Sequence, residues 1–360
     1  MVNHAASEFF DTLQKIMPQE TSVAQNIPEV TPNRLFQFVW GFGPPLIIEA
    51  AIRTGLFDAL AGGPLPLEEL AKATGASSRG VRAVMDALVG INLAARDTHG
   101  RYLLTAESDQ FLVSSRPTFQ GGLFRHISQS LIPNWLSLNE CVKTGKPVQS
   151  VNEQKQGAEF FRDFVEGLFA PFYPGALALA KGLALPQNTP IAVLDIAAGS
   201  GVWGIAFAQT YPQARISAVD WEAVIPVTKK VTSRLGVSER YTYIPGDILE
   251  ANFGSGYDVA TLGHILHSDG DERSRKLLRR VFDALRPGGT IAIAEFLVNE
   301  DRTEPPMPLI FAVNMLVNTA AGRTFSFGEI AGWLKEAGFT DARTLEAPAP
   351  SPLILATKPV

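Results

Sequence analysis

One stretch near the middle of the chain restricts its possible folds more than any other: PIAVLDIAAGSGVWG, from Pro190 to Gly204. It begins with a short apolar run, 191–196, of the kind that forms a strand buried on both faces of a sheet. A glycine-rich turn follows, in which Gly199 and Gly201 allow the backbone to approach a ligand closely, and a helical pattern begins at Val202. The stretch therefore predicts the first strand, turn and helix of a nucleotide-binding α/β domain.

Three acidic residues, each at the end of a predicted strand, indicate which nucleoside this domain binds. They are Asp195, Asp220 and Asp247. The letters GSGVWG also fit the dinucleotide pattern GxGxxG with an acid about twenty residues further on, so NAD remains an alternative. An acid directly before the turn would repel a pyrophosphate, whereas it could hold an ammonium group. The three acids favour S-adenosylmethionine, which has a sulfonium, an ammonium group and a ribose but no phosphate.

The composition narrows the class of protein. A chain of 360 residues can form two domains, and a net charge of -5 gives no basic surface for nucleic acid. The single cysteine, Cys141, excludes an internal disulfide framework and fits a reducing compartment. No apolar run reaches the roughly twenty residues of a membrane span, and the N-terminus lacks the pattern of a secretion signal. We therefore expect a cytoplasmic, soluble protein without nucleic-acid or membrane partners.

The N-terminal part predicts a helical module. Residues 1–30 form at most one amphipathic helix, of a kind that packs on a partner subunit. The strongly apolar helical pattern of 34–60 must be buried, in its own core or in a dimer. Two shorter helices at 64–75 and 77–89, the second with its N-cap at Ser77 or the next serine, precede a predicted β-hairpin at 91–105. This order predicts a winged helix.

A winged helix could bind DNA, but the charges of this one favour dimerisation. Its second helix carries only Arg79 and Arg82, opposed by Asp86, which is too few cations to neutralise several phosphates. We predict a winged-helix-like dimerisation domain at 1–118 and a helical, substrate-covering segment at 119–184.

The remainder, 185–360, alternates strand and helix, which predicts a Rossmann-like, doubly wound and largely parallel sheet. The fold class is thus α/β with an N-terminal, mainly α domain. Strands are expected at 191–197, 215–219, 241–245, 257–263, 289–296, near 340–346 and at 352–357, and helices at 202–210, 223–235, 271–285 and 326–337.

Several motifs, in this order, make the chain resemble a known family. They are AAIRTGLFDAL, the stretch from LEELAKATG to YLLTAES, VLDIAAGSG, GDIL and HILHSDGDERSRKLLRRVFDALRPGGTIAIAE. The chain resembles the class I S-adenosylmethionine-dependent O-methyltransferases of the plant caffeate and bacterial natural-product type. The resemblance implies a homodimer, formed through the N-terminal domain, that methylates a hydroxylated aromatic or polyketide-like small molecule.

The resemblance also implies roles for particular residues. His267 matches the family's general base and Glu295 a carboxylate beside it, while Asp220 matches the acid that binds the ribose hydroxyls. Asp247 matches the acid beside the adenine amino group. Ala197 takes the place of a glycine as a conservative replacement. The cofactor-binding residues implied are Asp195, Ala197, Gly199, Gly201, Asp220, Trp221, Gly246, Asp247, Ile248 and Leu249. The substrate-binding residues expected from helices that wall the pocket in relatives are Trp135, Phe164, Phe169, Phe311, Met315 and Asn318.

The sequence departs from the family at three positions. Ser268 stands where an acid usually follows the base, Gly322 where a second flanking carboxylate is expected, and Gly263 where the family has a lysine. Because one carboxylate is missing, methylation of carbon or nitrogen and a non-methylating, cofactor-binding relative remain alternatives. His264 and His267 are three residues apart, a spacing that could bind a metal, but no third ligand is evident and we predict no metal site.

Overall fold

The computed structural model describes residues 30–147, 150, 164–348 and 351–360. The amphipathic pattern before residue 30 lies outside this part of the chain. Contacts between residues divide the chain into two compact units, Met1–Asp109 and Gln110–Val360. The segment 119–184 therefore belongs to the second unit. In the described ranges, no helix has the length and apolar character needed to cross a membrane.

The first unit has the helix, helix and hairpin order of the predicted winged helix. The Ser77 side chain caps the second of these helices by accepting a hydrogen bond from the Gly80 N–H. Its elements are α2 (Asn33–Val39), α3 (Gly43–Arg53), α4 (Leu56–Leu60), α5 (Leu67–Thr74), α6 (Ser78–Gly90), β1 (Ala94–Arg96), β2 (Tyr102–Leu104) and, at the border of the second unit, α7 (Ala106–Leu112).

The apolar pattern predicted as one helix over 34–60 is in fact three helices. Helix α3 starts at Gly43 with Pro44 and Pro45 in its first turn, where the missing N–H groups are tolerated. Gly55 separates α3 from α4. Its φ of 74° is a conformation that few other residues adopt without strain. Helices α3 and α4 bury apolar residues in their own unit, whereas α2 exposes its apolar residues.

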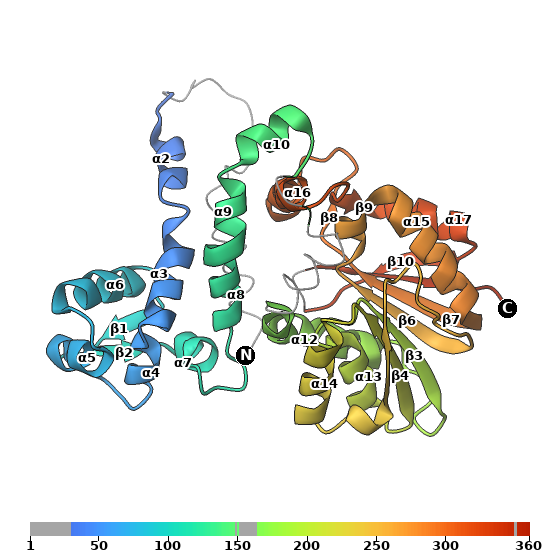
Figure 1. Ribbon diagram of the computed structural model, residues 1–360, viewed down its shortest axis with the longest axis horizontal. Helices are drawn as coiled ribbons and strands as arrows, with labels where there is room; N and C mark the ends of the chain where they lie inside the picture. Colours follow the sequence, from blue (N-terminus) through green and yellow to red (C-terminus); the bar gives the residue numbers. More distant parts are fainter. Residues whose placement is uncertain (1–29, 148–149, 151–163, 349–350) are drawn as a thin grey trace, which may run out of the picture. The chain divides into compact units, whose positions relative to one another are not determined.

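A seven-stranded sheet forms the centre of the second unit (Figure 1), in the order β10-β11-β7-β6-β3-β4-β5. The strands from β3 to β7 are parallel, and β11 and β10 are antiparallel to their neighbours. The predicted doubly wound, largely parallel sheet is confirmed. The strands are β3 (Ile191–Ile196), β4 (Ala214–Asp220), β5 (Tyr241–Pro245), β6 (Tyr257–Gly263), β7 (Leu285–Ala294), β10 (Thr340–Leu345) and β11 (Leu353–Thr357).

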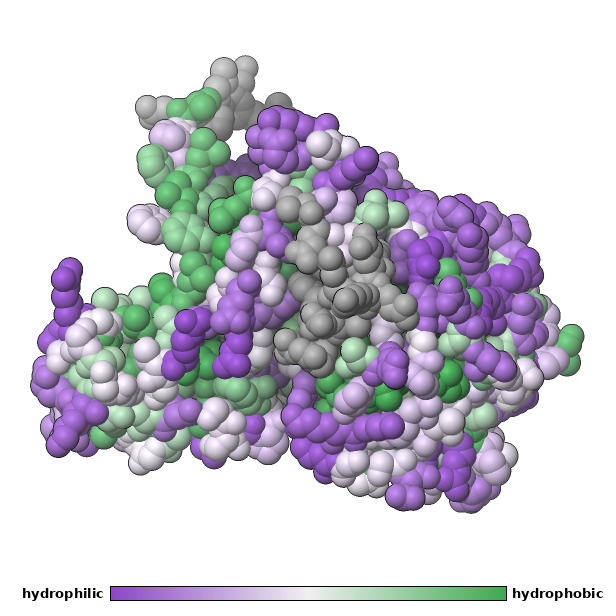
Figure 2. All heavy atoms as spheres, in the orientation of Figure 1, coloured by the Kyte–Doolittle hydropathy of each residue, from purple (hydrophilic) through white to green (hydrophobic). Residues whose placement is uncertain are grey.

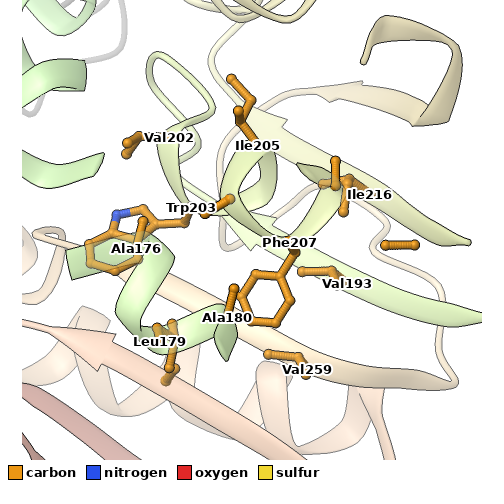
Figure 3. Close-up of a cluster of buried hydrophobic side chains, with 14 of the residues drawn as sticks. Ala176, Leu179, Ala180, Val193, Val202, Trp203, Ile205, Phe207, Ile216 and Val259 are labelled. Carbon is orange, nitrogen blue, oxygen red and sulfur yellow. The ribbon is translucent and has the colours of Figure 1, made fainter. Parts of the chain in front are cut away.

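Helices cover both faces of this sheet, because residues that alternate along each strand point to opposite faces. Val193 of β3 packs with α12 and α13 in the cluster of Figure 3, whereas Leu194, the next residue, packs on the other face with α15 and α17. The helices are α12 (Phe169–Gly182), α13 (Val202–Thr210), α14 (Ile225–Arg234), α15 (Leu266–Ala284) and α17 (Phe327–Ala337).

The second unit contains further elements. They are α8 (Gly121–His126), the π-helix η1 (Ile127–Leu131), α9 (Ile132–Trp135), α10 (Leu138–Thr144), the 3-10 helices η2 (Val165–Leu168) and η3 (Ser238–Arg240), the paired β8 (Leu297–Val298) and β9 (Phe325–Ser326), and α16 (Pro306–Asn318). The parallel strands end at one edge of the sheet, where ligands bind in folds of this kind. This edge gathers the acidic residues and the histidines singled out in the sequence.

Candidate functional site

A cavity with about 970 Å³ of empty space, including its open mouth, lies at the carboxyl ends of β3 to β6. The turn after β3, the acids after β4 and β5, and the first turn of α15 all contribute to its wall. The lining residues include Ala197, Gly199, Asp220, Trp221, Asp247, Ile248 and His267 from the predicted site, together with Val165, Leu168, Phe172, Trp203, His264, Asp269 and Arg273. The second group was not predicted as cofactor- or substrate-binding.

The turn after β3 takes the conformation that its glycines permit. Gly199 and Gly201 have φ values of 54° and 77°, and Gly201 is the N-cap of α13. Ala197, however, also has a positive φ, 53°. An alanine in this region is strained by roughly 1 kcal/mol, so its replacement of a glycine is not conservative for the backbone. Strain of this kind is tolerated where the surrounding structure enforces it.

Asp195 does not line the cavity. Its carboxylate is fully buried and accepts hydrogen bonds from the Gly204 N–H (2.9 Å) and from the Thr261 hydroxyl (2.8 Å). Burial, with a smaller contribution from the charge of Asp220, raises its pKa to about 7. Gly204 is the third residue of α13, so Asp195 acts as a cap for that helix. The carboxylate therefore does not face the cavity, where the sequence led us to expect it beside an ammonium group.

Asp220 lies at the end of β4 and lines the cavity. It accepts hydrogen bonds from the Gly199 and Trp221 N–H groups, each at 2.7 Å, and burial raises its pKa to about 6. Its backbone carbonyl accepts the Gly246 N–H. Asp220 thus joins the turn after β3 to the loop after β5, and each carboxylate oxygen keeps a lone pair for a further donor. Gly246 itself does not line the cavity.

After β5, a second acidic side chain lines the cavity. Asp247 accepts the Leu249 N–H at 2.7 Å, and Arg273 of α15 donates to both of its oxygens at 3.1 and 3.2 Å. Ile248 offers an apolar surface beside it, while Leu249 packs against the core instead. Arg273 also forms an ion pair with Asp269. With Asp220, this part of the wall holds three carboxylates and one guanidinium, which favours a cationic ligand and opposes a pyrophosphate.

The predicted base and its carboxylate form a buried pair. His267 Nδ1 is 2.7 Å from Glu295 Oε2, and the backbone N–H of His267 donates to Glu295 Oε1 at 3.2 Å. Burial disfavours the ionised form of Glu295, but the charge of His267 and its hydrogen bonds outweigh burial, and the pKa of Glu295 is lowered. Glu295 therefore fixes the tautomer of the histidine and leaves Nε2 as the basic nitrogen. Phe311 of α16 meets the imidazole edge-on at 4.9 Å.

Two departures from the family pattern have a steric cause in this chain. A Cβ at Gly322 would lie 2.4 Å from the backbone oxygen of His267 and 2.4 Å from Thr319 Oγ1. A Cβ at Gly263 would lie 1.9 Å from Nε1 of Trp203. Neither position can carry a side chain while its neighbours stay in place. The His267 carbonyl and the Thr319 hydroxyl occupy the space that an acid at 322 would need, and the Trp203 indole occupies the space that a lysine at 263 would need.

His264 is brought into the cavity wall by strained backbone, with φ 60°. Its Nε2 lies 2.8 Å from the Ser351 hydroxyl, its ring packs on Phe172 with centroids 4.1 Å apart, and burial lowers its pKa to about 3. It precedes α15, so it does not share a helical turn with His267. In the described ranges, no group of three or more His, Cys, Asp or Glu side chains could hold a metal.

The six residues predicted to bind substrate are divided between two places, and none of them lines the cavity. Trp135 donates to Asn314 at 2.9 Å, and Asn134 donates to Asn318 at 2.7 Å, so α9 and α16 are joined. Met315 and Phe311 also belong to α16, and Phe311 reaches the histidine. The other two predicted residues lie elsewhere: Phe164 stacks on His126, and Phe169 stacks on Tyr173.

Some lining residues could have been found from the sequence. Phe172 and Val165 belong to the aromatic segment that precedes the nucleotide unit. Phe172 lies three positions after Phe169, the residue that was predicted, in the same helix. Asp269 and Arg273 are four residues apart, the spacing of an ion pair in a helix, although Gly270 between them has the non-helical angles φ 75° and ψ 179°. Nothing in the sequence indicates the positive φ of His264.

Comparisons with known proteins agree with this architecture. The family model for the O-methyltransferase domain matches residues 181–340, and that for the O-methyltransferase dimerisation domain matches 36–114. The chain is 30% identical over 325 residues to a 3-hydroxy-5-methyl-1-naphthoate 3-O-methyltransferase of Streptomyces sahachiroi, covering 89% of this chain and 92% of the relative. It is 29% identical over 336 residues to the tetracenomycin polyketide synthesis 8-O-methyltransferase TcmO of Streptomyces glaucescens, covering 91% and 97%.

A solved structure of PigF, a Serratia protein, with S-adenosylhomocysteine is also similar. It has a TM-score of 0.76 and 26% identity to this chain, and the match covers 91% of this chain and 99% of that one.

Proposed function

Since this chain belongs to the family of S-adenosylmethionine-dependent O-methyltransferases, we propose that it methylates a hydroxyl group of an aromatic, polyketide-like molecule, with His267 as the general base. The buried pair of His267, which lines the cavity, and Glu295 behind it is the observation that supports this proposal most directly. The two bacterial relatives named above act on a naphthoate and in tetracenomycin polyketide synthesis, which favours a fused aromatic substrate.

The cavity wall fits S-adenosylmethionine, which supplies a methyl group on a sulfonium sulfur. Its three carboxylates and one guanidinium leave a net negative surface for a cation. Asp220 would accept hydrogen bonds from the ribose hydroxyls, and the positive φ of Gly199 would let the backbone come close to the ribose. Ile248 offers an apolar contact for a base beyond the ribose. Asp195, one of the predicted cofactor residues, would contribute indirectly. Its carboxylate accepts the Gly204 N–H and so holds α13 and the turn before it.

His267 would take the proton of the acceptor hydroxyl at Nε2. A phenol becomes a strong nucleophile when it loses this proton, and a neutral imidazole accepts it near pH 7. Glu295 keeps the proton of the imidazole on Nδ1 and stabilises the charged ring that forms. Phe311 and Phe296 pack around the imidazole and limit the entry of water. Much of the remaining catalysis then comes from positioning the hydroxyl in line with the transferred methyl group.

The substrate pocket, in this proposal, lies between the base and the helices α9 and α16. The hydrogen bonds Trp135–Asn314 and Asn134–Asn318 hold these two helices together, so their apolar side chains can form one wall. Met315 and Phe311 from α16 would supply flat apolar surface near His267. Such a wall suits an aromatic ring system.

We also propose that the chain works as a homodimer in the cytoplasm. The match to the dimerisation domain and the exposed apolar residues of α2 support the dimer. The single, buried, free cysteine supports a reducing compartment.

The decisive experiment is a turnover assay on hydroxynaphthoates and hydroxylated polyketide aromatics with S-adenosylmethionine. Wild-type protein should form a methylated product, and carbon NMR should show the new methyl on oxygen. His267→Ala should lose at least about 100-fold in kcat, because a general base contributes about that much, while it still binds S-adenosylhomocysteine. A methyl on carbon or nitrogen would contradict the proposal, and so would undiminished turnover by His267→Ala.

A further inference from the structure

One short 3-10 helix, η2, forms part of the cavity wall and carries a charged residue on its outer side. Val165 and Leu168 of this helix line the cavity, and their spacing of three positions places them on one side of a 3-10 helix. Glu166 does not line the cavity, and its side chain contacts α14 instead. The helix has only four residues, and an isolated turn of helix is not stable in water. Its position therefore depends on its contacts with other elements.

On its cavity side, η2 lies against the glycine turn that follows β3. A Cβ added at Gly199 would be 3.6 Å from the Cβ of Val165, which is only 6% exposed. The same turn is fixed to α14, because the Thr228 hydroxyl donates to the Gly199 carbonyl at 2.7 Å. Val224, the residue before α14, also lines the cavity. Three elements, η2, the turn after β3 and α14, therefore meet on this side of the cavity.

Glu166 connects η2 directly to α14. Lys230 Nζ donates to its Oε2 at 2.8 Å, and Arg234 Nη1 donates to its Oε1 at 2.7 Å. Lys230 and Arg234 are four residues apart in α14 and so lie on one face of that helix. Burial disfavours the ionised carboxylate, but the two cations outweigh burial and lower the pKa of Glu166. One negative charge on η2 is thus held by two positive charges on α14.

The other contacts of η2 do not fix its position relative to α14. A Cβ at Gly167 would lie 3.5 Å from the backbone nitrogen of Leu123, so this side of η2 packs against α8. Val165 also shares an apolar cluster with Val227 of α14, but apolar packing is not directional. Hydrogen-bonded ion pairs are directional, and the two of Glu166 join η2 and α14 at a defined distance.

From this arrangement, we propose that Glu166 is a positioning residue for the cofactor: through Lys230 and Arg234 it holds η2 over the turn after β3, where η2 covers bound S-adenosylmethionine. The inference rests on the cofactor, but not on the methyl acceptor or the general base. Without these ion pairs, η2 leaves the turn for part of the time. The apparent affinity for the cofactor then falls in proportion to the fraction of molecules in which η2 is in place, and the cofactor dissociates faster.

The test is binding of S-adenosylhomocysteine, with the affinity from calorimetry and the dissociation rate from stopped-flow fluorescence. Glu166→Gln keeps the size of the side chain and removes its charge. We expect it to bind about 3- to 10-fold more weakly, as for the loss of two partly exposed ion pairs, and to release the ligand faster by a similar factor. The double variant Lys230→Gln and Arg234→Gln should show the same loss. Adding Glu166→Gln to it should change nothing further, because all three changes remove one interaction.

Salt gives a readout that depends on the charges. S-adenosylhomocysteine carries one ammonium and one carboxylate group and has no net charge, which limits the direct effect of salt on its binding. At about 1 M salt, where charges are screened beyond about 3 Å, wild-type protein should bind about as weakly as Glu166→Gln. The affinity of Glu166→Gln itself should change little with salt.

Reversal of the charges tests the pairing itself. Glu166→Arg places like charges together and should weaken binding more than Glu166→Gln does. Combined with Lys230→Glu and Arg234→Glu, it restores opposite charges, and this triple variant should recover most of the wild-type affinity. Melting curves confirm folding, and the double glutamine variant of α14 serves if Glu166→Gln does not fold.

Glu272→Gln is the matched control. Glu272 accepts a hydrogen bond from Lys276 at 2.7 Å on α15, and neither residue lines the cavity. The variant removes an ion pair of the same kind, so it should keep the wild-type affinity and dissociation rate for S-adenosylhomocysteine.

The outcomes are distinguishable from a failure of the proposed reaction. Unchanged affinity and dissociation rate in Glu166→Gln at low salt would overturn the inference, as would a loss that the charge-reversed triple variant does not recover. Absence of any binding to wild-type protein would overturn both the inference and the cofactor assignment. The expected changes in binding without methylation of any phenol would support the inference and contradict only the proposed substrate and chemistry.

Discussion

At the scale of single residues, the pair of His267 and Glu295 leads to the first prediction. Glu295→Gln keeps the shape of the side chain but removes the charge that stabilises a protonated imidazole. We expect kcat to fall by about 100-fold or more, within the range of general-base catalysis. Affinity for S-adenosylhomocysteine should not change, because Glu295 does not line the cavity. An unchanged kcat, measured with saturating cofactor, would contradict the role of Glu295.

Asp195 leads to a prediction about pH. Its pKa is raised to about 7 by burial, whereas an unfolded aspartate titrates near 3.8. Between these values the folded state binds the extra proton, so the contribution of Asp195 to the free energy of unfolding falls as pH rises from about 4 to 7. Asp195→Asn removes the charge and can keep both hydrogen bonds, since the Thr261 hydroxyl can accept as well as donate.

We therefore expect Asp195→Asn without cofactor to be more stable than wild type at pH 8, by about 4 kcal/mol at most. The difference should shrink as pH falls towards 5. Melting temperatures of both proteins over this pH range provide the measurement. A variant that is less stable than wild type at pH 8, or a difference that does not depend on pH, would show that the carboxylate is ionised without cost in the folded protein.

At the scale of elements, the loop at Gly322 sets the position of the base. Gly322→Ala places a Cβ 2.4 Å from the His267 carbonyl oxygen, so either the loop or the start of α15 must move. We expect a loss of about 1 to 3 kcal/mol in stability from overpacking, and a lower kcat because His267 is displaced.

Gly332→Ala in α17 is the matched control, because a Cβ there meets nothing within 4 Å. This change within a helix should stabilise the protein by about 0.5 to 1 kcal/mol and leave kcat unchanged. Chemical denaturation and steady-state kinetics measure both effects. If Gly322→Ala behaved like Gly332→Ala, the close packing at Gly322 would have no role in placing the base.

The strands and helices of the catalytic unit could be predicted because each has a local signal. Val193 and Leu194 lie in an apolar run that both faces of the sheet bury, and Ser326 and Glu329 form the capping box that begins α17. The breaks after α2 and at Gly55 were missed, because the apolar pattern continues through them and only the positions of glycine and proline mark the ends.

The site residues whose role depends on their chemical type could be predicted from the sequence. Those whose role depends on the direction in which the side chain points were harder to predict. Asp220 and Asp247 face the cavity, but the similar position of Asp195 at the end of β3 turns its carboxylate towards α13. The strain at Ala197 and His264 depends on backbone angles that neighbouring elements impose. Phe172 rather than Phe169 lines the cavity because of the rotation of α12, which aromatic content alone does not specify.

At the scale of the whole molecule, the apolar surface of α2 and the residues after it needs an explanation. Six large apolar residues between Leu35 and Phe42 each expose more than half of their surface. They are Leu35, Phe36, Phe38, Val39, Trp40 and Phe42, and Figure 2 shows hydrophobic side chains gathered over this helix. A contiguous apolar patch of this kind typically marks a protein interface, and the match to the dimerisation domain includes most of it.

We predict that the double variant Phe36→Glu and Trp40→Glu shifts the protein from dimer to monomer in light scattering, because charges in an apolar interface lose their hydration. Ile91→Glu is the control: this residue is in the same unit, but it is an isolated and only 38% exposed apolar side chain, and the dimer should persist.

The monomer should still bind S-adenosylhomocysteine, since every residue that lines the cavity lies in the second unit. A double variant that remains dimeric would assign the apolar surface of α2 to another partner, and a monomer without cofactor binding would mean that dimerisation supports the fold of the catalytic unit.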